Sequence, residues 1–148
     1  MKIYMGADHN GYELKKQLKA YLEQSGYQVE DVGDLTPDPQ DDYPVFAAKV
    51  VTAMRTSDDR DPRGLLICGS GQGICIAANR FKGIRAAVCD NPEDARSGRN
   101  DDDTNVLCLP ARIVALDRAE STLKTWLDTA FAGAERYKRR IVQLDELG

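Results

Sequence analysis

The sequence predicts an α/β fold in which a parallel sheet is built from strands joined by helical crossovers. Short β-rich runs alternate with helical patterns from one end of the chain to the other, which is typical of this class. Several of the runs are apolar at consecutive positions, as strands buried on both faces of a sheet require. The length of 148 residues is that of one ordinary domain, so we expect a single domain over residues 1–148.

The strand candidates are runs of four to six residues rich in apolar and β-branched side chains, and they cover residues 2–5, 27–32, 64–68, 84–88 and 106–109. A helix is expected over residues 11–25, where Leu14, Leu18 and Leu22 recur on one stripe opposite lysines and glutamates. A second helix is expected over residues 44–55, because it opens with a proline, which suits the first turn of a helix.

Four further helices follow along the chain. The third begins near Gly73, directly after a predicted strand, and the fourth begins near Pro92. The fifth shows a shared apolar face made by Ala119, Leu123, Trp126 and Leu127. The last, over about 135–147, is densely basic at its start and acidic at its end. A terminal helix of this kind often packs on a neighbouring subunit.

The composition argues against several classes of protein. A net charge of −4 leaves no basic stripe of the kind that binds nucleic acid, so an anionic ligand must be met by a local group of arginines. No run approaches about 18 apolar residues and no apolar leader is present, which indicates a cytoplasmic protein that does not enter a membrane. Four cysteines without Cys-x-x-Cys spacing and a single histidine predict neither disulfides nor a zinc site.

Polar segments follow most of the predicted strands, and in an open parallel sheet ligands bind beyond the carboxyl ends of the strands. These segments are residues 8–11, 68–73, 90–91 and 110–112. An irregular stretch over residues 33–42, with two prolines and four aspartates, is expected as a surface loop that borders such a site.

Three glycines, Gly69, Gly71 and Gly73, lie between a predicted strand and a predicted helix, in a segment (residues 69–73) called the glycine loop below. Such glycines let backbone N–H groups converge beside the positive end of a helix, which favours an anion. Ile74 stands where a dinucleotide motif needs its last glycine, and no Gly-Lys-Ser/Thr is present, so both nucleotide motifs are incomplete. The alternative is that the glycines only permit a tight turn.

Two side chains beside these loops are candidates for proton transfer. Cys68 ends a predicted strand directly before the glycine loop, where a helix N-terminus favours the thiolate; the alternative is a buried strand cysteine. His9, the only histidine, follows the first strand among small and polar residues. It is a candidate phosphate contact or proton carrier, with Asp8 beside it. The alternative there is that Asp8 or Asn10 caps the first helix.

Arg112, Arg136 and Arg140 are candidate phosphate ligands, because a guanidinium binds phosphate through two parallel hydrogen bonds. Arg136 and Arg140 are four residues apart and share one helical face. The alternative to phosphate binding is that this face is a solvated basic surface. The three consecutive acids at residues 101–103 have no partner at metal-ligand spacing, so no metal is expected.

Five groups of residues together carry a resemblance to one family. They are Gly6-x-Asp8-His9-x-Gly11 with Leu14-Lys15, Asp42-Tyr43-Pro44, Cys68-Gly69-Ser70-Gly71-x-Gly73-Ile74, Ala77-Ala78-Asn79 with Gly83-Ile84-Arg85-Ala86, and Asp103-Thr104-Asn105-Val106-Leu107. Nearly from end to end, the chain resembles ribose-5-phosphate isomerase B, within the wider group that includes galactose-6-phosphate isomerase. The resemblance implies a Rossmann-like three-layer sandwich with a five-stranded parallel sheet, active sites at the interface of a homodimer, and no cofactor.

The resemblance also implies roles for single residues. Cys68 would be the base that moves a proton between C1 and C2 of the sugar, with Ser70 beside it, and the amides of Gly69, Gly71 and Gly73 would hold the enediolate oxygen. The remaining contacts would come from His9, Arg112, Arg136 and Arg140 to the phosphate, from Asp8 and Asn105 to sugar hydroxyls, and from Tyr43 as a wall of the pocket.

Two departures from the family pattern bear on the substrate. Asp101 stands where ribose-type members commonly carry a ring-opening histidine. Ring opening would then use Asp101, Asp102 or Asp8, unless the substrate differs from ribose 5-phosphate. Near the C-terminus, an extra residue and a missing histidine put the register of Arg136 and Arg140 in question.

The favoured function is therefore isomerisation between ribose 5-phosphate and ribulose 5-phosphate through a cis-enediolate, without cofactor or metal. The first alternative keeps the chemistry but acts on a hexose 6-phosphate or another pentose phosphate. The second is a phosphosugar-binding protein without turnover, and the third is a flavodoxin-like mononucleotide binder. Whether dimers pair into tetramers is left open.

Overall fold

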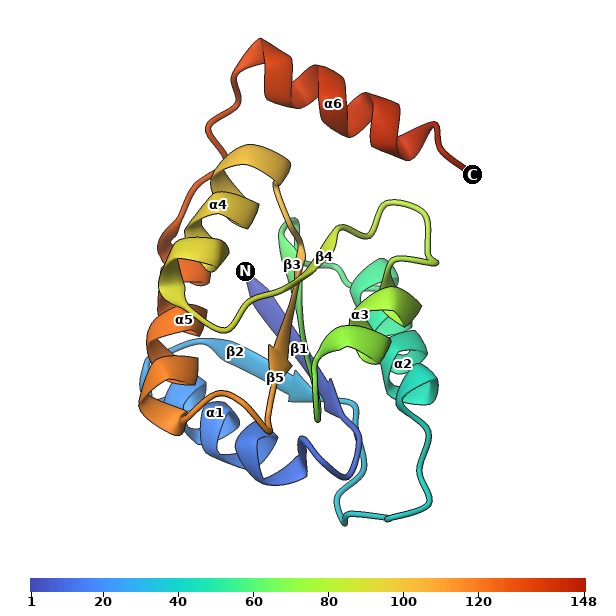
Figure 1. Cartoon of the computed structure of the whole chain (residues 1–148), viewed down its shortest axis with the longest axis vertical. Helices are drawn as coiled ribbons and strands as arrows, with labels where there is room; N and C mark the ends of the chain where they lie inside the picture. The colour runs from blue at the N-terminus through green and yellow to red at the C-terminus, as the bar shows by residue number, and fades with distance from the viewer.

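The alternating apolar and amphipathic runs form five parallel strands and six helices in the computed structural model, which describes residues 1–148 (Figure 1). The strands are β1 (Lys2–Ala7), β2 (Gln28–Asp31), β3 (Pro62–Cys68), β4 (Ala86–Val88) and β5 (Val106–Pro110). The helices are α1 (Tyr12–Gln24), α2 (Tyr43–Arg55), α3 (Gln72–Ala78), α4 (Pro92–Asp102), α5 (Leu116–Asp128) and α6 (Glu135–Asp145). The sheet order is β2-β1-β3-β5-β4, which confirms the predicted fold class.

Helices cover both faces of the sheet, so the expected three-layer arrangement is also confirmed (Figure 1). α1, α4 and α5 cover one face, where Met5, Ile67 and Leu107 belong to a core of 17 buried residues. α2 and α3 cover the other face, where Leu66 and Cys108 belong to a second core of 13 buried residues. Because side chains alternate between the two faces along a strand, consecutive apolar positions supply both cores.

Two predicted strands are shorter in the structure, because hydrogen bonds outside the sheet engage their first residues. The backbone N–H of Tyr27 donates to Leu22 O (3.0 Å) in the turn after α1, so β2 begins at the following residue. The backbone N–H of Arg85 donates to the side chain of Asn105 (2.8 Å), so β4 begins only at Ala86. Both strands lie at the edges of the sheet.

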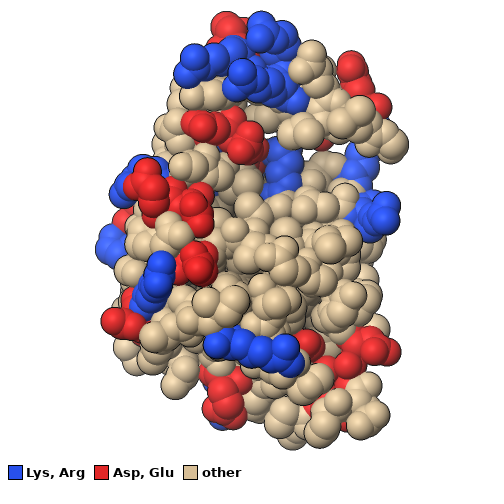
Figure 2. Space-filling view, in the orientation of Figure 1, with Lys and Arg blue, Asp and Glu red and all other residues tan.

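The C-terminal helix α6 stands apart from the two cores. It has no buried residue. In Figure 1 it lies next to α4, at the end of the molecule away from the carboxyl ends of β1 and β3. Its lysines and arginines gather on the surface at that end (Figure 2). An amphipathic helix without a covered apolar face is suited to packing against another chain.

None of the helices combines the length and the apolar composition that a membrane crossing requires.

Candidate active site

Three loops meet where the carboxyl ends of β1, β3 and β5 lie side by side. Both β2 and β3 follow β1 in the chain and pair with its two opposite edges, so the strand order reverses at β1, and a crevice for a ligand forms at such a point. Backbone hydrogen bonds join the loops: Asp8 N–H donates to Ile67 O (3.2 Å), and Ala111 N–H donates to Cys68 O (2.9 Å). The segments that the sequence singled out are therefore held next to one another.

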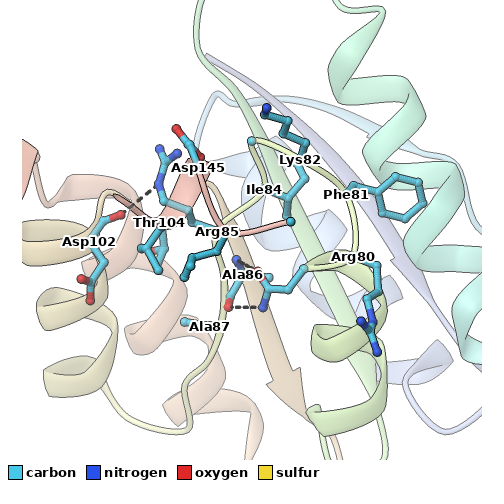
Figure 3. A pocket seen from close by; sticks show the side chains of 15 residues that line it. Arg80, Phe81, Lys82, Ile84, Arg85, Ala86, Ala87, Asp102, Thr104 and Asp145 are labelled. Atoms are coloured by element: carbon cyan, nitrogen blue, oxygen red, sulfur yellow. Dashed lines mark hydrogen bonds between the residues drawn. The ribbon is translucent and has the colours of Figure 1, made fainter. Parts of the chain in front are cut away.

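A cavity of about 170 Å³ opens at this edge of the sheet. Its lining comes from all three loops and from the start of α2, and comprises Asp8, Asn10, Tyr43, Cys68, Gly69, Ser70, Gly73 and Arg112. A larger cavity of about 470 Å³ lies at the opposite end of the molecule, between residues 79–87 and the end of α6 (Figure 3). That cavity holds neither a thiol nor an imidazole, so we place the candidate active site in the smaller one.

Cys68 is the last residue of β3 and is 4% exposed. The backbone N–H of Gly71 donates to its Sγ over 3.1 Å. Gly71 presents this N–H from a backbone with φ of +74°, in the left-handed region that favours glycine. The glycine loop thus supports the thiol as well as forming the turn.

Two other glycines leave room for the large side chains that border the cavity. A Cβ on Gly69 would lie 2.8 Å from Cζ of Arg112, and a Cβ on Gly73 would lie 2.7 Å from Cζ of Tyr43. Both distances are shorter than an ordinary contact between carbon atoms. Arg112 also donates from Nη2 to Asn10 Oδ1 over 3.4 Å, which links the loop after β5 to the loop after β1.

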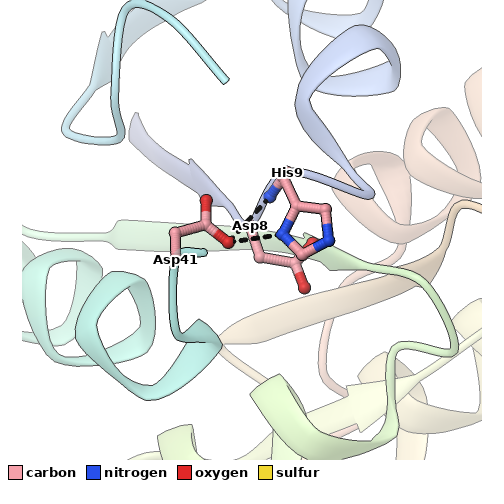
Figure 4. Close-up of side chains that lie close together, drawn as sticks. All are labelled: Asp8, His9 and Asp41. Atoms are coloured by element: carbon pink, nitrogen blue, oxygen red, sulfur yellow. Dashed lines mark hydrogen bonds and ion pairs between the residues drawn. The ribbon is translucent and has the colours of Figure 1, made fainter. Parts of the chain in front are cut away.

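His9 is held by Asp41, which lies just before α2 (Figure 4). Nδ1 of the ring lies 2.6 Å from Oδ1 of Asp41, and the backbone N–H of His9 donates to the same oxygen over 3.2 Å. The hydrogen bond to Asp41 raises the pKa of His9 above its usual 6.5. The negative charges of Asp41 and Asp8 act in the same direction, and the charge of Arg112 opposes them.

Asp8 is 6% exposed, and its Oδ1 accepts the backbone N–H groups of Asn10 (3.0 Å) and Gly11 (3.2 Å). These bonds close the turn before α1, but the N-cap of α1 is Gly11 and no side chain caps the helix, so neither Asp8 nor Asn10 has the capping role. Ligand atoms of Asp8, His9 and Asp41 all lie within 4.8 Å of one another. Hydrogen bonds among these residues and to the backbone explain this grouping, and we assign it no metal.

The other predicted site residues lie toward the opposite end of the sheet. Asn105 precedes β5, roughly 16 Å from Cys68 along the strand direction at about 3.3 Å per residue. Its side-chain oxygen and nitrogen are both bonded to backbone groups. Asp101 lies in the last turn of α4, and Arg136 and Arg140 lie on α6. Within one chain, these four side chains do not line the cavity around Cys68.

Two residues of the site, Asn10 and Asp41, were not predicted from the sequence as site residues. Asn10 was considered only as a helix cap, whereas it lines the cavity and accepts a hydrogen bond from Arg112. Asp41 was not identified. It is one of four aspartates in the loop at residues 33–42, and its contact with His9 joins positions 32 residues apart. The expectation that this loop borders a site was the only signal for it.

The other three cysteines are buried, and none of them lines the cavity. Burial raises the pKa of Cys89 to about 12 and raises that of Cys108 well above its usual value. A hydrogen bond with Cys108 lowers the pKa of Cys75. Cys68 is the one thiol that both borders the cavity and accepts a glycine-loop amide.

Comparison with known proteins gives consistent matches over nearly the whole chain. The sequence profile described as Ribose/Galactose Isomerase matches residues 3–144. Ribose-5-phosphate isomerase B of Escherichia coli (strain K12) is 40% identical over 138 residues, which cover 93% of this chain and 91% of that protein. The 4-deoxy-4-sulfo-D-erythrose isomerase of Clostridium sp. (strain MSTE9) is 37% identical, covering 88% of this chain and 81% of that protein.

Among solved structures, ribose-5-phosphate isomerase B from Mycoplasma genitalium with bound ribulose-5-phosphate superposes with a TM-score of 0.90. It is 36% identical to this chain, and the match covers 98% of this chain and 94% of the other.

Proposed function

Because the chain belongs to the ribose/galactose isomerase family, we propose that it interconverts ribose 5-phosphate and ribulose 5-phosphate. Its enzyme class is that of its relatives, the aldose–ketose isomerases. From the open-chain aldose, one proton leaves C2 to give a cis-enediolate, one is returned to C1, and a hydroxyl proton passes from O2 to O1. The observation that carries the proposal is the Cys68 thiol beside the glycine loop in the cavity.

Cys68 supplies the base in this proposal. Its Sγ accepts the Gly71 N–H, and as a thiolate it would take the proton from C2 and return it to C1. The amide of Gly73 lies in the first turn of α3, where backbone N–H groups lack a carbonyl partner within the helix. It is suited to the enediolate oxygen, and one such donor is worth about 3 kcal/mol to the transition state. Ser70 Oγ accepts a neighbouring backbone N–H (3.3 Å), so its own proton is left for a substrate oxygen.

The substrate's phosphate is assigned to His9 and Arg112 within this chain. The Arg112 guanidinium lies against Gly69, and guanidinium and imidazolium groups both donate to phosphate oxygens. Asp8 has one carboxylate oxygen engaged by the backbone, which leaves the other for a sugar hydroxyl. The ring of Tyr43 forms a wall beside the glycine loop.

We assign Asp101, Asn105, Arg136 and Arg140 to the site of a second copy, in a homodimer whose active sites lie at the interface. Two observations support this: the four residues are remote from the cavity of their own chain, and α6 has no buried residue. A hydrogen bond with Tyr137 raises the pKa of Arg136, and the negative charge of Asp101 acts in the same direction. The helices that carry the two residues, α4 and α6, contact each other. Asp101 would then serve the ring-opening step of the partner's site.

A second candidate is the same reaction on a different anionic sugar. It is favoured by Asp101 in the place of the usual histidine and by the Clostridium relative, whose name gives a sulfonated tetrose as its substrate. Sulfonates and phosphates present similar oxygens to a guanidinium, and hexose 6-phosphates belong to the same group of candidates. Binding without turnover is the weaker alternative, because a binding protein needs no base at Cys68.

The test is the rate at which the purified protein forms ribulose 5-phosphate from ribose 5-phosphate, with Cys68→Ala and the buried-thiol control Cys89→Ala in parallel. We expect Cys68→Ala to lower kcat by a factor of about 10³ and to keep phosphate binding, while Cys89→Ala stays active. Undiminished turnover by Cys68→Ala would contradict the assignment of the base. An inactive wild type that converts another sugar phosphate or a sulfonated sugar would favour the second candidate.

A further inference from the structure

The contact between Asp41 and His9 has no role in the reaction described so far. We propose that Asp41 is a positioning residue: its carboxylate binds Nδ1–H and favours the doubly protonated His9 ring, so that Nε2–H donates to the anionic group of the substrate. The inference deepens the proposed function and rests on it, since it takes His9 as a ligand of that phosphate or sulfonate.

A single oxygen of Asp41 binds both the ring and the backbone of His9. Oδ1 lies 2.6 Å from ring Nδ1 and 3.2 Å from the backbone nitrogen. A carboxylate has no proton to donate, so Nδ1 carries the hydrogen in this contact. Figure 4 shows the second ring nitrogen directed away from Asp41. Two bonds to one residue therefore fix the ring and leave Nε2 free.

The exposure of the two side chains differs in the way that this arrangement requires. The side chain of Asp41 is 7% exposed, whereas that of His9 is 33% exposed. The backbone N–H of Asp41 donates to Asp38 O (3.0 Å), which holds the turn that carries the carboxylate. Asp41 is thus a covered, anchored group that acts through a ring open to solvent.

The charges around His9 determine whether Nε2 accepts or donates a hydrogen bond. With the Nδ1 proton bound to Asp41, a neutral ring offers a lone pair at Nε2, which repels a phosphate oxygen, and only the protonated ring offers N–H. Asp41 before α2 and Asp8 after β1 favour the protonated ring, and Arg112 after β5 opposes it. The hydrogen bond to Asp41 is the largest contribution, and the net result is a raised pKa of His9.

Nuclear magnetic resonance tests this directly, because His9 is the only histidine and its ring signals need no assignment. The pH titration of these signals would be compared in the wild type, Asp41→Asn, Asp41→Glu and the control Asp38→Asn. The Asp41→Asn side chain retains an oxygen that can accept both hydrogen bonds but loses the charge. If Asp41 only anchored the loop, the pH titration of the His9 signals would be the same in Asp41→Asn and in the wild type.

We expect the pKa of His9 to fall in Asp41→Asn, to recover toward the wild-type value in Asp41→Glu, and to stay at that value in Asp38→Asn. Asp38→Asn is a suitable control because this substitution removes the same charge from the same loop. The Asp38 carboxylate accepts a hydrogen bond from the backbone N–H of Gln40 (2.9 Å) and none from His9. An unchanged pKa of His9 in Asp41→Asn would overturn the proposal.

Steady-state kinetics provide the second readout. At about pH 8, KM for ribose 5-phosphate should rise about tenfold in Asp41→Asn, as for the loss of one charge-assisted hydrogen bond, with little change in kcat. Because His9 would lose its proton at lower pH in this variant, the rise of KM with pH should begin earlier than in the wild type. The same KM and pH dependence in both proteins would overturn the proposal.

The role of Asp41 can be separated from the identity of the substrate with inorganic phosphate as the probe. Weaker binding of phosphate to Asp41→Asn than to the wild type, followed through the His9 signals, supports the role of Asp41 even if ribose 5-phosphate is not turned over. Equal binding to the two proteins would overturn it, whatever the substrate proves to be.

Discussion

In the candidate site, the glycine loop and two large side chains share the same small space. Gly69 and Gly73 let Arg112 and Tyr43 lie directly against the backbone of the loop. The cavity is therefore walled by large side chains but lined by bare amides next to Cys68. At these two positions, glycine is required for close approach and not for an unusual backbone angle.

We expect Gly73→Ala to displace the ring of Tyr43, because the new Cβ would lie 2.7 Å from Cζ of the ring. Tyr43 is 41% exposed and its ring can move toward solvent, so Gly73→Ala should lower the free energy of unfolding by less than about 1 kcal/mol. The misplaced wall should lower kcat/KM about tenfold or more. Steady-state rates and urea unfolding measure the two effects.

The double-mutant cycle with Tyr43→Ala identifies the cause. In that background there is no ring to displace, so adding Gly73→Ala should change kcat/KM only slightly. An equal loss in both backgrounds would show that the ring is not what the substitution disturbs.

At the scale of elements, a buried lysine binds the start of the loop that carries Asp41. Lys15 on α1 is 1% exposed. Its Nζ donates to the carboxylate of Asp31 in β2 (2.9 Å) and to the backbone oxygen of Asp34 (3.0 Å). One ammonium group thus joins a helix, an edge strand and the start of the 33–42 loop. The loop that carries Asp41 begins at this junction.

We expect Lys15→Met to lower the free energy of unfolding by about 3 kcal/mol, because the carboxylate of Asp31, 13% exposed, would lose its counter-ion. Lys16→Met is the matched control on the same helix. Lys16 has an exposed pair with Glu13 at 3.7 Å and lies over the Tyr12 ring, 5.4 Å from its centroid, so its loss should cost less than about 1 kcal/mol. Urea unfolding compares the three proteins, and equal stabilities of the two variants would contradict a special role for Lys15.

At the scale of the whole molecule, one chain leaves both its surface and its proposed site incomplete. On α6 and just after it, Val142, Leu144 and Leu147 are 56%, 48% and 77% exposed. In Figure 1, α6 lies at the opposite end of the molecule from the carboxyl end of β3, where Cys68 borders the cavity. A two-fold arrangement would bring the α6 end of each chain to the cavity of the other, so each dimer would hold two complete sites.

Complementation between two defective variants tests this arrangement. Cys68→Ala removes the base, and Arg140→Ala removes a phosphate contact that we assign to the partner's site, so each variant alone should be strongly impaired. After joint refolding of equal amounts, about half of the dimers combine both variants, and one of the two sites in each is intact. The mixture should therefore recover about a quarter of the wild-type activity.

The oligomeric state is measured on the same samples by sedimentation. A dimeric mixture that is no more active than its components would contradict the assignment of Arg140 to the partner's site.

The sequence by itself determined the elements and their order. Hydrophobic period and glycine placement are set by the backbone geometry of a few consecutive residues, so strands, helices, the glycine loop and Cys68 at a strand end could all be predicted locally. The starts of β2 and β4 could not be predicted this way. They depend on hydrogen bonds made by Tyr27 in a turn and by Arg85 to the distant Asn105.

Only the tertiary structure decided which side chains share a site. Asp41 meets His9 from 32 residues away, through a loop that begins beside Lys15. Asp101 and Arg140 fit the expected site by sequence position, yet they lie on α4 and α6 and do not line the cavity of their own chain. The physical reason is that a periodic pattern depends on neighbouring residues, whereas a contact between distant loops depends on how the sheet places its strands side by side.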